Sequence, residues 1–136
     1  MKLTGILPAL VTPFDINDAI DFKAFEQLLT FLRNTGVSGW VPCGSTGEYY
    51  AMTADERAEV LKFVADFANA NELLIAGTND GSTREVIRHT ERAYELGYRT
   101  VLLAPPYKAC IFKYLARNKT TFFISIIFFH HAAHFS

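Results

Sequence analysis

Hydrophobic residues follow two alternating patterns through residue 107 of the 136-residue chain. Short continuous apolar runs, at residues 5–11, 39–43, 73–76 and 100–104, predict four strands. Between these runs, apolar residues recur every three or four positions, which is the spacing of one face of a helix. Three helices are therefore predicted, with apolar faces formed by Phe22, Phe25, Leu28, Leu29 and Leu32, by Val60, Leu61, Val64 and Phe67, and by Val86, His89, Ala93 and Leu96.

Capping residues stand at the ends of these helical segments. Asp21 can cap the first helix, and residues 53–56 and 82–85 both have the Ser/Thr-x-x-Glu spacing of a capping box. Gly36 and Gly97 can end the first and third helices. The second helix is expected to run to about residue 70.

The resulting βαβαβαβ order predicts a mainly parallel α/β sheet with right-handed crossovers. Half of a (β/α)8 barrel and a small doubly wound sheet both satisfy this order. In either architecture the chemistry lies beyond the carboxyl ends of the strands, so the loops after Val11, Cys43, Gly77 and Ala104 are the places where a site is expected.

The loop at residues 44–48 is the most informative of the four. Its sequence, Gly-Ser-Thr-Gly-Glu, places the hydroxyls of Ser45 and Thr46 between two glycines. Glycines let backbone N–H groups approach an anion that the hydroxyls also bind, which suits a small carboxylate or phosphate. A tight strand-to-helix turn without a ligand would use the same residue types. Neither a Walker loop nor a dinucleotide fingerprint is present.

Composition narrows the class of protein. The chain is 50% hydrophobic and carries a net charge of −1, so it is expected to be globular and not to bind nucleic acid. Cys43 and Cys110 lie far apart without metal-ligand spacing, which favours a cytoplasmic setting and predicts no disulfide framework. His130, His131 and His134 lack a carboxylate partner, so no metal is predicted.

The composition changes after Tyr107. Residues 1–107 carry nine Lys and Arg against fourteen Asp and Glu, whereas residues 108–136 carry four Lys and Arg, no acid, no glycine and no proline. The apolar run at residues 122–129 is too short to cross a bilayer, so membrane attachment is not expected, and it reads instead as a β-favouring segment prone to aggregation. Two units are predicted, a folded part at 1–107 and a tail at 108–136.

Four ordered motifs make the first of these units resemble a known family. They are Leu7-Pro8-Ala9-Leu10-Val11-Thr12-Pro13-Phe14, Gly44-Ser45-Thr46-Gly47-Glu48, Ala76-Gly77-Thr78 and Ala104-Pro105-Pro106-Tyr107. Their order and spacing resemble the dihydrodipicolinate synthase / N-acetylneuraminate lyase family. The resemblance covers residues 3–107 and implies the first four strands and three helices of a (β/α)8 barrel.

The resemblance also implies a function. Members are pyruvate-dependent class I aldolases and lyases, in which a lysine forms a Schiff base with a 2-oxo acid and no further cofactor is needed. By resemblance, Ser45 and Thr46 bind the 2-oxo acid carboxylate, Ser45 joins the proton relay, and Tyr107 matches the first of two paired tyrosines in that relay.

The chain departs from the family pattern after Tyr107. Lys108 replaces the second tyrosine, and no lysine stands in the Gly-[Ile/Val]-Lys-[Asp/Glu] context of the Schiff-base strand. We therefore nominate no nucleophile. Two functions stay open. The first is part of a truncated or read-through Schiff-base lyase. The second is a non-catalytic half barrel, either an unstable by-product or an assembly module that covers its open edges by homo-oligomerisation.

Overall fold

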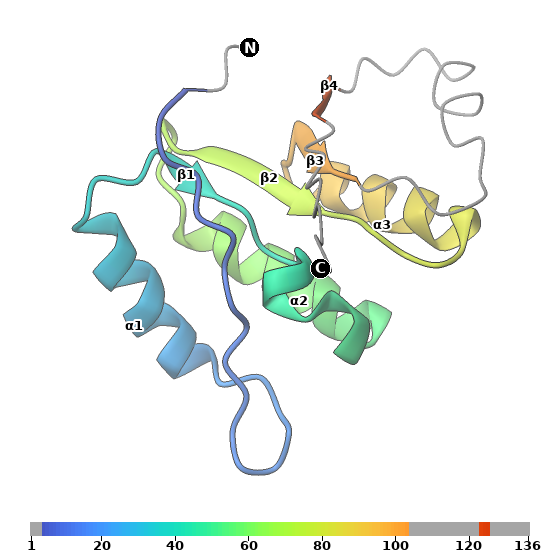
Figure 1. Ribbon diagram of the computed structural model, residues 1–136, viewed down its shortest axis with the longest axis horizontal. Helices are drawn as coiled ribbons and strands as arrows, with labels where there is room; N and C mark the ends of the chain where they lie inside the picture. The colour runs from blue at the N-terminus through green and yellow to red at the C-terminus, as the bar shows by residue number, and fades with distance from the viewer. Residues whose placement is uncertain (1–3, 104–122, 126–136) are drawn as a thin grey trace, which may run out of the picture.

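The computed structural model describes residues 4–103 and 123–125. Figure 1 shows three helices following one another along a sheet in chain order. The elements are α1 (Phe22–Arg33), β1 (Gly39–Trp40), the 3-10 helices η1 (Ser45–Gly47) and η2 (Tyr49–Ala51), α2 (Ala54–Phe67), β2 (Leu73–Gly77), α3 (Thr83–Glu95), β3 (Thr100–Leu102) and β4 (Phe123–Ser125).

The sheet is parallel, with strand order β1-β2-β3-β4. Between β1, β2 and β3 each crossover contains a helix, which confirms the predicted α/β class. β4 belongs to the segment predicted as a tail, and its parallel pairing with β3 agrees with the β-favouring composition of that run. The strand predicted at 100–104 is confirmed over Thr100–Leu102, and residue 104 lies outside the described part.

The first predicted strand is wrong as a regular element. Residues 5–11 run beside β1 but form only an isolated parallel bridge, from Ala9 to Val41. The Leu10 amide donates to the Val41 carbonyl at 3.0 Å, and the Val41 amide donates to the Pro8 carbonyl at 3.2 Å. Because proline has no N–H, the segment cannot continue the ladder through that residue.

Two of the three predicted N-terminal caps are confirmed. The Asp21 carboxylate accepts the Ala24 amide at 2.9 Å at the start of α1. At α2, Thr53 Oγ1 accepts the Glu56 amide at 3.2 Å while the Glu56 carboxylate accepts the Thr53 amide at 2.7 Å. Both partners of this capping box are local, so the four-residue pattern was sufficient to find it. α2 ends at Phe67, three residues before the predicted end.

The capping box predicted at the start of α3 is wrong. The Ser82 side chain makes no capping hydrogen bond. Asp80 Oδ1 already accepts the Ser82 amide at 2.9 Å, and the Glu85 carboxylate contacts Arg88 Nη1 at 3.1 Å. Both partners of one of the two capping-box contacts, the Ser82 amide and the Glu85 carboxylate, are thus paired with residues outside the four-residue pattern.

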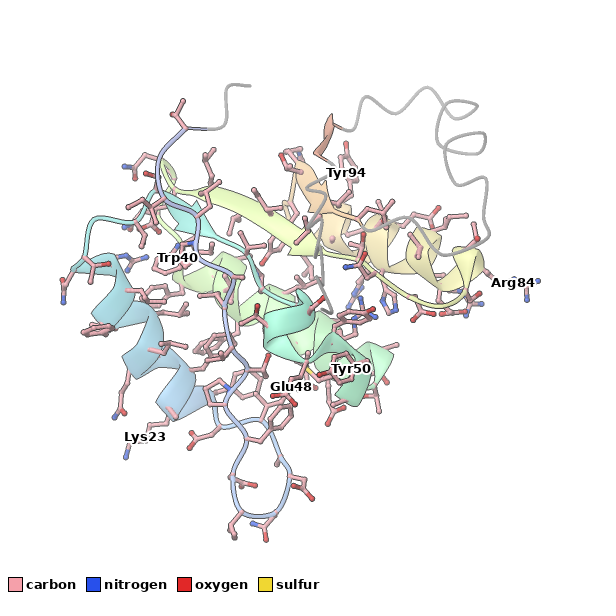
Figure 2. All side chains as sticks on the ribbon, in the orientation of Figure 1. Lys23, Trp40, Glu48, Tyr50, Arg84 and Tyr94 are labelled. Carbon is pink, nitrogen blue, oxygen red and sulfur yellow. The ribbon has the colours of Figure 1, made fainter. Side chains whose placement is uncertain are left out.

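The core lies between the helices and the strands. Its largest fully buried side chains include those of Trp40, Tyr98, Phe25, Leu29, Val60 and Val64. Figure 2 shows Trp40 between α1 and β1. The hydroxyl of Tyr98 donates to the Leu61 carbonyl at 2.8 Å, so this buried phenol is satisfied.

An ion pair joins the end of α1 to the start of β2. Arg33 donates to both carboxylate oxygens of Glu72, at 2.9 and 2.8 Å. Trp40 Nε1 and the Asn69 amide donate to the same carboxylate, at 2.9 and 2.8 Å. Burial by itself raises the pKa of Glu72, but the hydrogen bonds from Arg33, Asn69 and Trp40 outweigh it and bring the pKa to about 2.

Candidate functional site

The loop after β1 presents the two predicted binding hydroxyls at the carboxyl end of the sheet. Ser45 and Thr46 are exposed and open the 3-10 helix η1, whereas Gly44 and Gly47 on either side are buried. The Gly47 amide donates to the Gly44 carbonyl at 3.0 Å. Among the residues that the structure describes, the amides and hydroxyls of Ser45 and Thr46 donate no hydrogen bond, so two N–H groups and two hydroxyls of exposed residues are without a partner there.

The N-terminal segment fixes this loop from one side. Thr12 Oγ1 donates to the Gly47 carbonyl at 2.8 Å in a buried hydrogen bond. A Cβ on Gly47 would lie 2.8 Å from the Leu10 carbonyl oxygen. Glycine at this position therefore lets the loop pack directly against the backbone of the segment that runs beside β1.

The end of β2 fixes the loop from the other side. Cys43 adopts a left-handed conformation with φ +56°, which is uncommon for a residue with a side chain. A Cβ on Gly77 would lie 2.0 Å from the Cys43 carbonyl oxygen, so only a glycine permits this approach of two backbones. The turn that carries Ser45 and Thr46 thus begins at a strained residue held by close packing.

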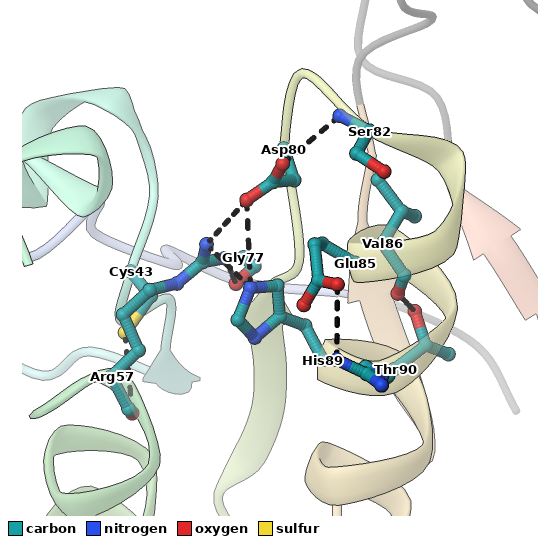
Figure 3. A network of polar contacts seen from close by, with 10 residues as sticks. Cys43, Arg57, Gly77, Asp80, Ser82, Glu85, Val86, His89 and Thr90 are labelled. Atoms are coloured by element: carbon teal, nitrogen blue, oxygen red, sulfur yellow. Dashed lines mark hydrogen bonds and ion pairs between the residues drawn. The ribbon is translucent and has the colours of Figure 1, made fainter. Parts of the chain in front are cut away.

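A buried arginine connects the two loops. Arg57, in α2, is 3% exposed, and its Nη2 donates to the Gly77 carbonyl at 3.3 Å. Arg57 Nη1 contacts His89 Nε2 at 3.0 Å and Asp80 Oδ2 at 3.6 Å (Figure 3). The Cys43 thiol contacts the Arg57 carbonyl at 3.8 Å. One residue therefore touches the end of β2, the loop after it, α3 and the turn after β1.

Arg57 and Asp80 are not among the site residues that the sequence motifs predicted. A signal was present: Arg57, Val60, Leu61 and Val64 have the spacing of one helical face, and all four are buried. A charged residue on an apolar stripe requires partners from other elements. The sequence places His89 on the apolar face of the third helix, as a core or boundary histidine, and its burial and polar partners agree with that placement.

The environment of this network favours the neutral forms of Cys43 and His89. Burial raises the pKa of the Cys43 thiol to about 12, although the charge of Arg57 opposes the rise, so Cys43 is a neutral thiol. Burial and the Arg57 charge lower the pKa of His89 against the opposing effect of Asp80. Because the arginine donates in the Arg57–His89 contact, Nε2 accepts and the neutral ring carries its proton on Nδ1.

The other residues considered from the sequence lie outside the described part of the chain or away from this loop. Tyr107, Cys110 and the three histidines of the tail lie outside the described residues. Lys23 and Lys62, the lysines within the described part, are exposed on helices. The described residues contain no group of His, Cys, Asp and Glu that could hold a metal ion, and no helix in this part of the chain is long and apolar enough to cross a membrane.

The aromatic residues after η1 differ in environment. Tyr49 is half-buried, and Arg57 Cζ lies 5.1 Å from the centre of its ring. Tyr50 is 71% exposed and points outward beside Glu48 near the start of α2 (Figure 2). From the sequence, two roles stay open for these tyrosines, lining a substrate mouth or forming a subunit contact. Their placement gives Tyr49 a packing contact with the arginine and leaves Tyr50 at the rim of the loop.

Proteins of one family are similar to this chain in sequence. The model of the dihydrodipicolinate synthetase family matches residues 2–130. The 4-hydroxy-tetrahydrodipicolinate synthase of Methanococcus vannielii is 39% identical over 105 residues, which are 77% of this chain and 36% of the relative. That of Chelativorans sp. is 41% identical over 103 residues, 76% of this chain and 35% of the relative. The chain therefore spans about a third of the length of these curated relatives.

Solved structures agree with the sequence matches. A dihydrodipicolinate synthase from Bacillus anthracis superposes with a TM-score of 0.82 at 32% identity, covering 93% of this chain and 46% of the other. The chloride-inhibited enzyme from Acinetobacter baumannii, complexed with pyruvate, superposes with a TM-score of 0.74 at 34% identity, covering 79% and 37%. These neighbours decide between the two predicted architectures in favour of part of a (β/α)8 barrel.

Proposed function

The chain belongs to the dihydrodipicolinate synthetase family, and we propose that its loop at residues 44–48 binds the carboxylate of pyruvate. The reaction class is aldol-type C–C bond formation or cleavage through a lysine Schiff base, as in a 4-hydroxy-tetrahydrodipicolinate synthase. One observation carries the proposal: Ser45 and Thr46 lie exposed at the carboxyl end of a parallel α/β sheet, and the amide and hydroxyl of each have no hydrogen-bond partner among the described residues. The related A. baumannii structure containing pyruvate supports the choice of ligand.

The proposed binding chemistry follows from the donors in the loop. A carboxylate accepts hydrogen bonds only, and Ser45 and Thr46 together offer two N–H and two O–H donors. Hydrogen bonds to a charged acceptor contribute more than neutral ones, so a preformed set of donors can hold a small anion in one orientation. Ser45 is also proposed to pass a proton, together with Tyr107, when the full reaction site is complete.

The chain is proposed to bind the 2-oxo acid without forming the imine. Neither Lys23 nor Lys62, the lysines of the described part, lies in a desolvated site at a strand end, which a reactive lysine requires. The remaining lysines do not stand in the sequence context of the Schiff-base strand. A non-catalytic half barrel that assembles with further copies is the competing function. For either function we propose a cytoplasmic setting, which the unpaired, buried Cys43 thiol supports.

Binding is tested by following the backbone amides of the full 136-residue chain during titration with pyruvate. Shifts concentrated at residues 44–48 are expected, and methyl pyruvate, which lacks the carboxylate, should not cause them. The double variant Ser45→Ala, Thr46→Val should weaken binding by about tenfold or more, because two charge-assisted hydrogen bonds are lost. Thr30→Val, an exposed hydroxyl on α1, is the matched control and should leave the affinity unchanged. Shifts elsewhere, or none, would refute the binding role.

Catalysis is tested separately by borohydride reduction in the presence of pyruvate, followed by mass spectrometry of the intact chain. We expect no added mass, because no lysine is placed to attack the ketone. A stable adduct on one lysine would show that the chain carries its own nucleophile. Binding without an adduct supports the carboxylate site alone, and neither binding nor adduct supports the assembly function, whose direct readout is the oligomeric state in solution.

A further inference from the structure

Burying the charged guanidinium of Arg57 in the core has a large desolvation cost. Its side chain is 4% exposed, its Nε is buried without a hydrogen-bond partner among the described residues, and Asp80, the carboxylate that contacts it, lies at 3.6 Å. Burial lowers the pKa of Arg57, which reflects the cost of keeping the charge there. An apolar side chain of similar length would fill this space without that desolvation cost. Packing alone therefore does not account for a guanidinium at this position.

The contacts of Arg57 converge on the backbone that supports the loop. Its Nη2 holds the carbonyl of Gly77, the residue whose Cα packs against the Cys43 backbone. Its own carbonyl accepts the Cys43 thiol, and its guanidinium lies 5.1 Å from the ring of Tyr49, directly after the loop. Both ends of the segment between Cys43 and Tyr49 are thus in contact with one side chain and its backbone.

The remaining contacts anchor Arg57 itself. His89 and Asp80 both lie against Nη1, and the His89 ring contacts the same carboxylate oxygen of Asp80 at 3.6 Å. Figure 3 shows this arrangement between α2 and α3, with Gly77 on the side of Cys43. The planar, forked guanidinium can reach Gly77 and His89 at the same time through different nitrogens, which a lysine ammonium on a single atom cannot do with this geometry.

We propose that Arg57 is a positioning residue for Ser45 and Thr46. By linking the Gly77 carbonyl to α3, Arg57 holds the end of β2 against Cys43. This contact maintains the left-handed conformation of Cys43, from which the loop that carries Ser45 and Thr46 begins. This inference rests on the proposed carboxylate-binding role of the loop. Arg57 does not touch the ligand in this arrangement. Its effect is to keep the donors in one geometry before the ligand arrives, which reduces the ordering that binding would otherwise require.

The test compares Arg57→Met with Arg88→Met in the full chain. Methionine keeps the length and removes the donors, whereas Arg88 is an exposed arginine of α3 whose loss should change neither loop nor binding. In the absence of ligand, Arg57→Met should shift the amide signals of residues 43–48 and raise their hydrogen exchange. Pyruvate binding should weaken by about tenfold or more, since small displacements of positioned groups have effects of this size or larger.

The amide signals measured without pyruvate test the role of Arg57 separately from the proposed binding of pyruvate. If the parent chain does not bind pyruvate, the proposed function fails, while the amide signals of residues 43–48 still decide whether Arg57 positions the loop. If Arg57→Met does not fold, Arg57→Lys is measured by the same criteria, with a change at the loop and a weaker affinity again expected. A folded Met or Lys variant with unchanged loop signals and unchanged affinity would overturn the inference. Loop signals that change only in proportion to a general loss of stability across α1 and β2 would also overturn it.

Discussion

The Glu72 carboxylate offers a quantitative test of the structure. It accepts hydrogen bonds from Arg33, Trp40 and the Asn69 amide, and its side chain is 8% exposed. Its pKa is about 2 in the folded chain against 4.5 for a free glutamate. A folded-state pKa below the unfolded one means that the ionised form stabilises the fold above pH 4.5, and this contribution is lost as the pH falls toward 2.

The size of the effect follows from the difference between the two pKa values. Each pKa unit corresponds to 1.36 kcal/mol, so at pH 7 the ionised carboxylate contributes about 3 kcal/mol. At pH 3, where the folded group is still mostly ionised and the unfolded one mostly protonated, the same linkage leaves about 1.4 kcal/mol. Glu72→Gln, which resembles the protonated acid, should therefore lower the free energy of unfolding by about 3 kcal/mol at pH 7 and by about half as much at pH 3.

Urea unfolding of the parent and Glu72→Gln at several pH values between 3 and 7 measures this difference directly. Glu91→Gln is the matched control, because Glu91 is an exposed carboxylate on α3. That variant should differ from the parent by less than about 0.5 kcal/mol throughout. A Glu72→Gln penalty that stays constant from pH 7 to pH 3 would refute the reasoning, because it would mean that the carboxylate is not preferentially ionised by its partners in the folded chain.

Two further substitutions test the packing that supports the site. Gly77→Ala should destabilise the chain by about 3 kcal/mol, because the added Cβ would meet the Cys43 backbone. Gly81→Ala is the control and should be nearly neutral, because no atom lies within 4 Å of the added Cβ. Thermal unfolding compares the two variants, and equal effects would contradict the close approach of β2 to the loop. Tyr98→Phe should cost about 1 kcal/mol by leaving the buried Leu61 carbonyl without its hydroxyl donor. Urea unfolding measures this loss, and an unchanged midpoint would show that the hydrogen bond does not form in solution.

The accuracy of each predicted element depended on whether neighbouring residues supported or interrupted its capping or apolar pattern. The helix at α2 was found because Thr53 and Glu56 satisfy each other across one turn. The same pattern failed at Ser82, where Asp80 outside the four-residue window takes the amide first. At the first strand the apolar pattern was present, but Pro8 removes the donor that a continuous ladder needs. Errors therefore arose where a residue competes with, or interrupts, an otherwise regular pattern.

In the candidate site, too, the residues whose arrangement depends on sequence neighbours could be predicted, and the residue that depends on distant partners could not. The donors at Ser45 and Thr46 could be predicted because glycines and hydroxyls adjacent in the sequence form one turn. Arg57 could not be assigned a role, since its partners lie 20 residues away at the Gly77 carbonyl and 32 away at His89 and meet it only after the strands and helices have packed. A sequence pattern could show that an arginine occupies an apolar stripe, but not which backbone it would hold.

The structure of the loop follows from contacts made by residues other than Ser45 and Thr46, the two proposed to bind the carboxylate. Gly47 packs against Leu10 from one side, and Gly77 packs against Cys43 from the other, both through backbone atoms at distances that exclude a side chain. Because these buried contacts set the course of the chain, Ser45 and Thr46 can stay exposed without being needed for packing. Their side chains should therefore be replaceable with little loss of stability but with loss of anion binding, whereas replacing the glycines should affect both. That difference separates a binding loop from a tight turn of the same composition.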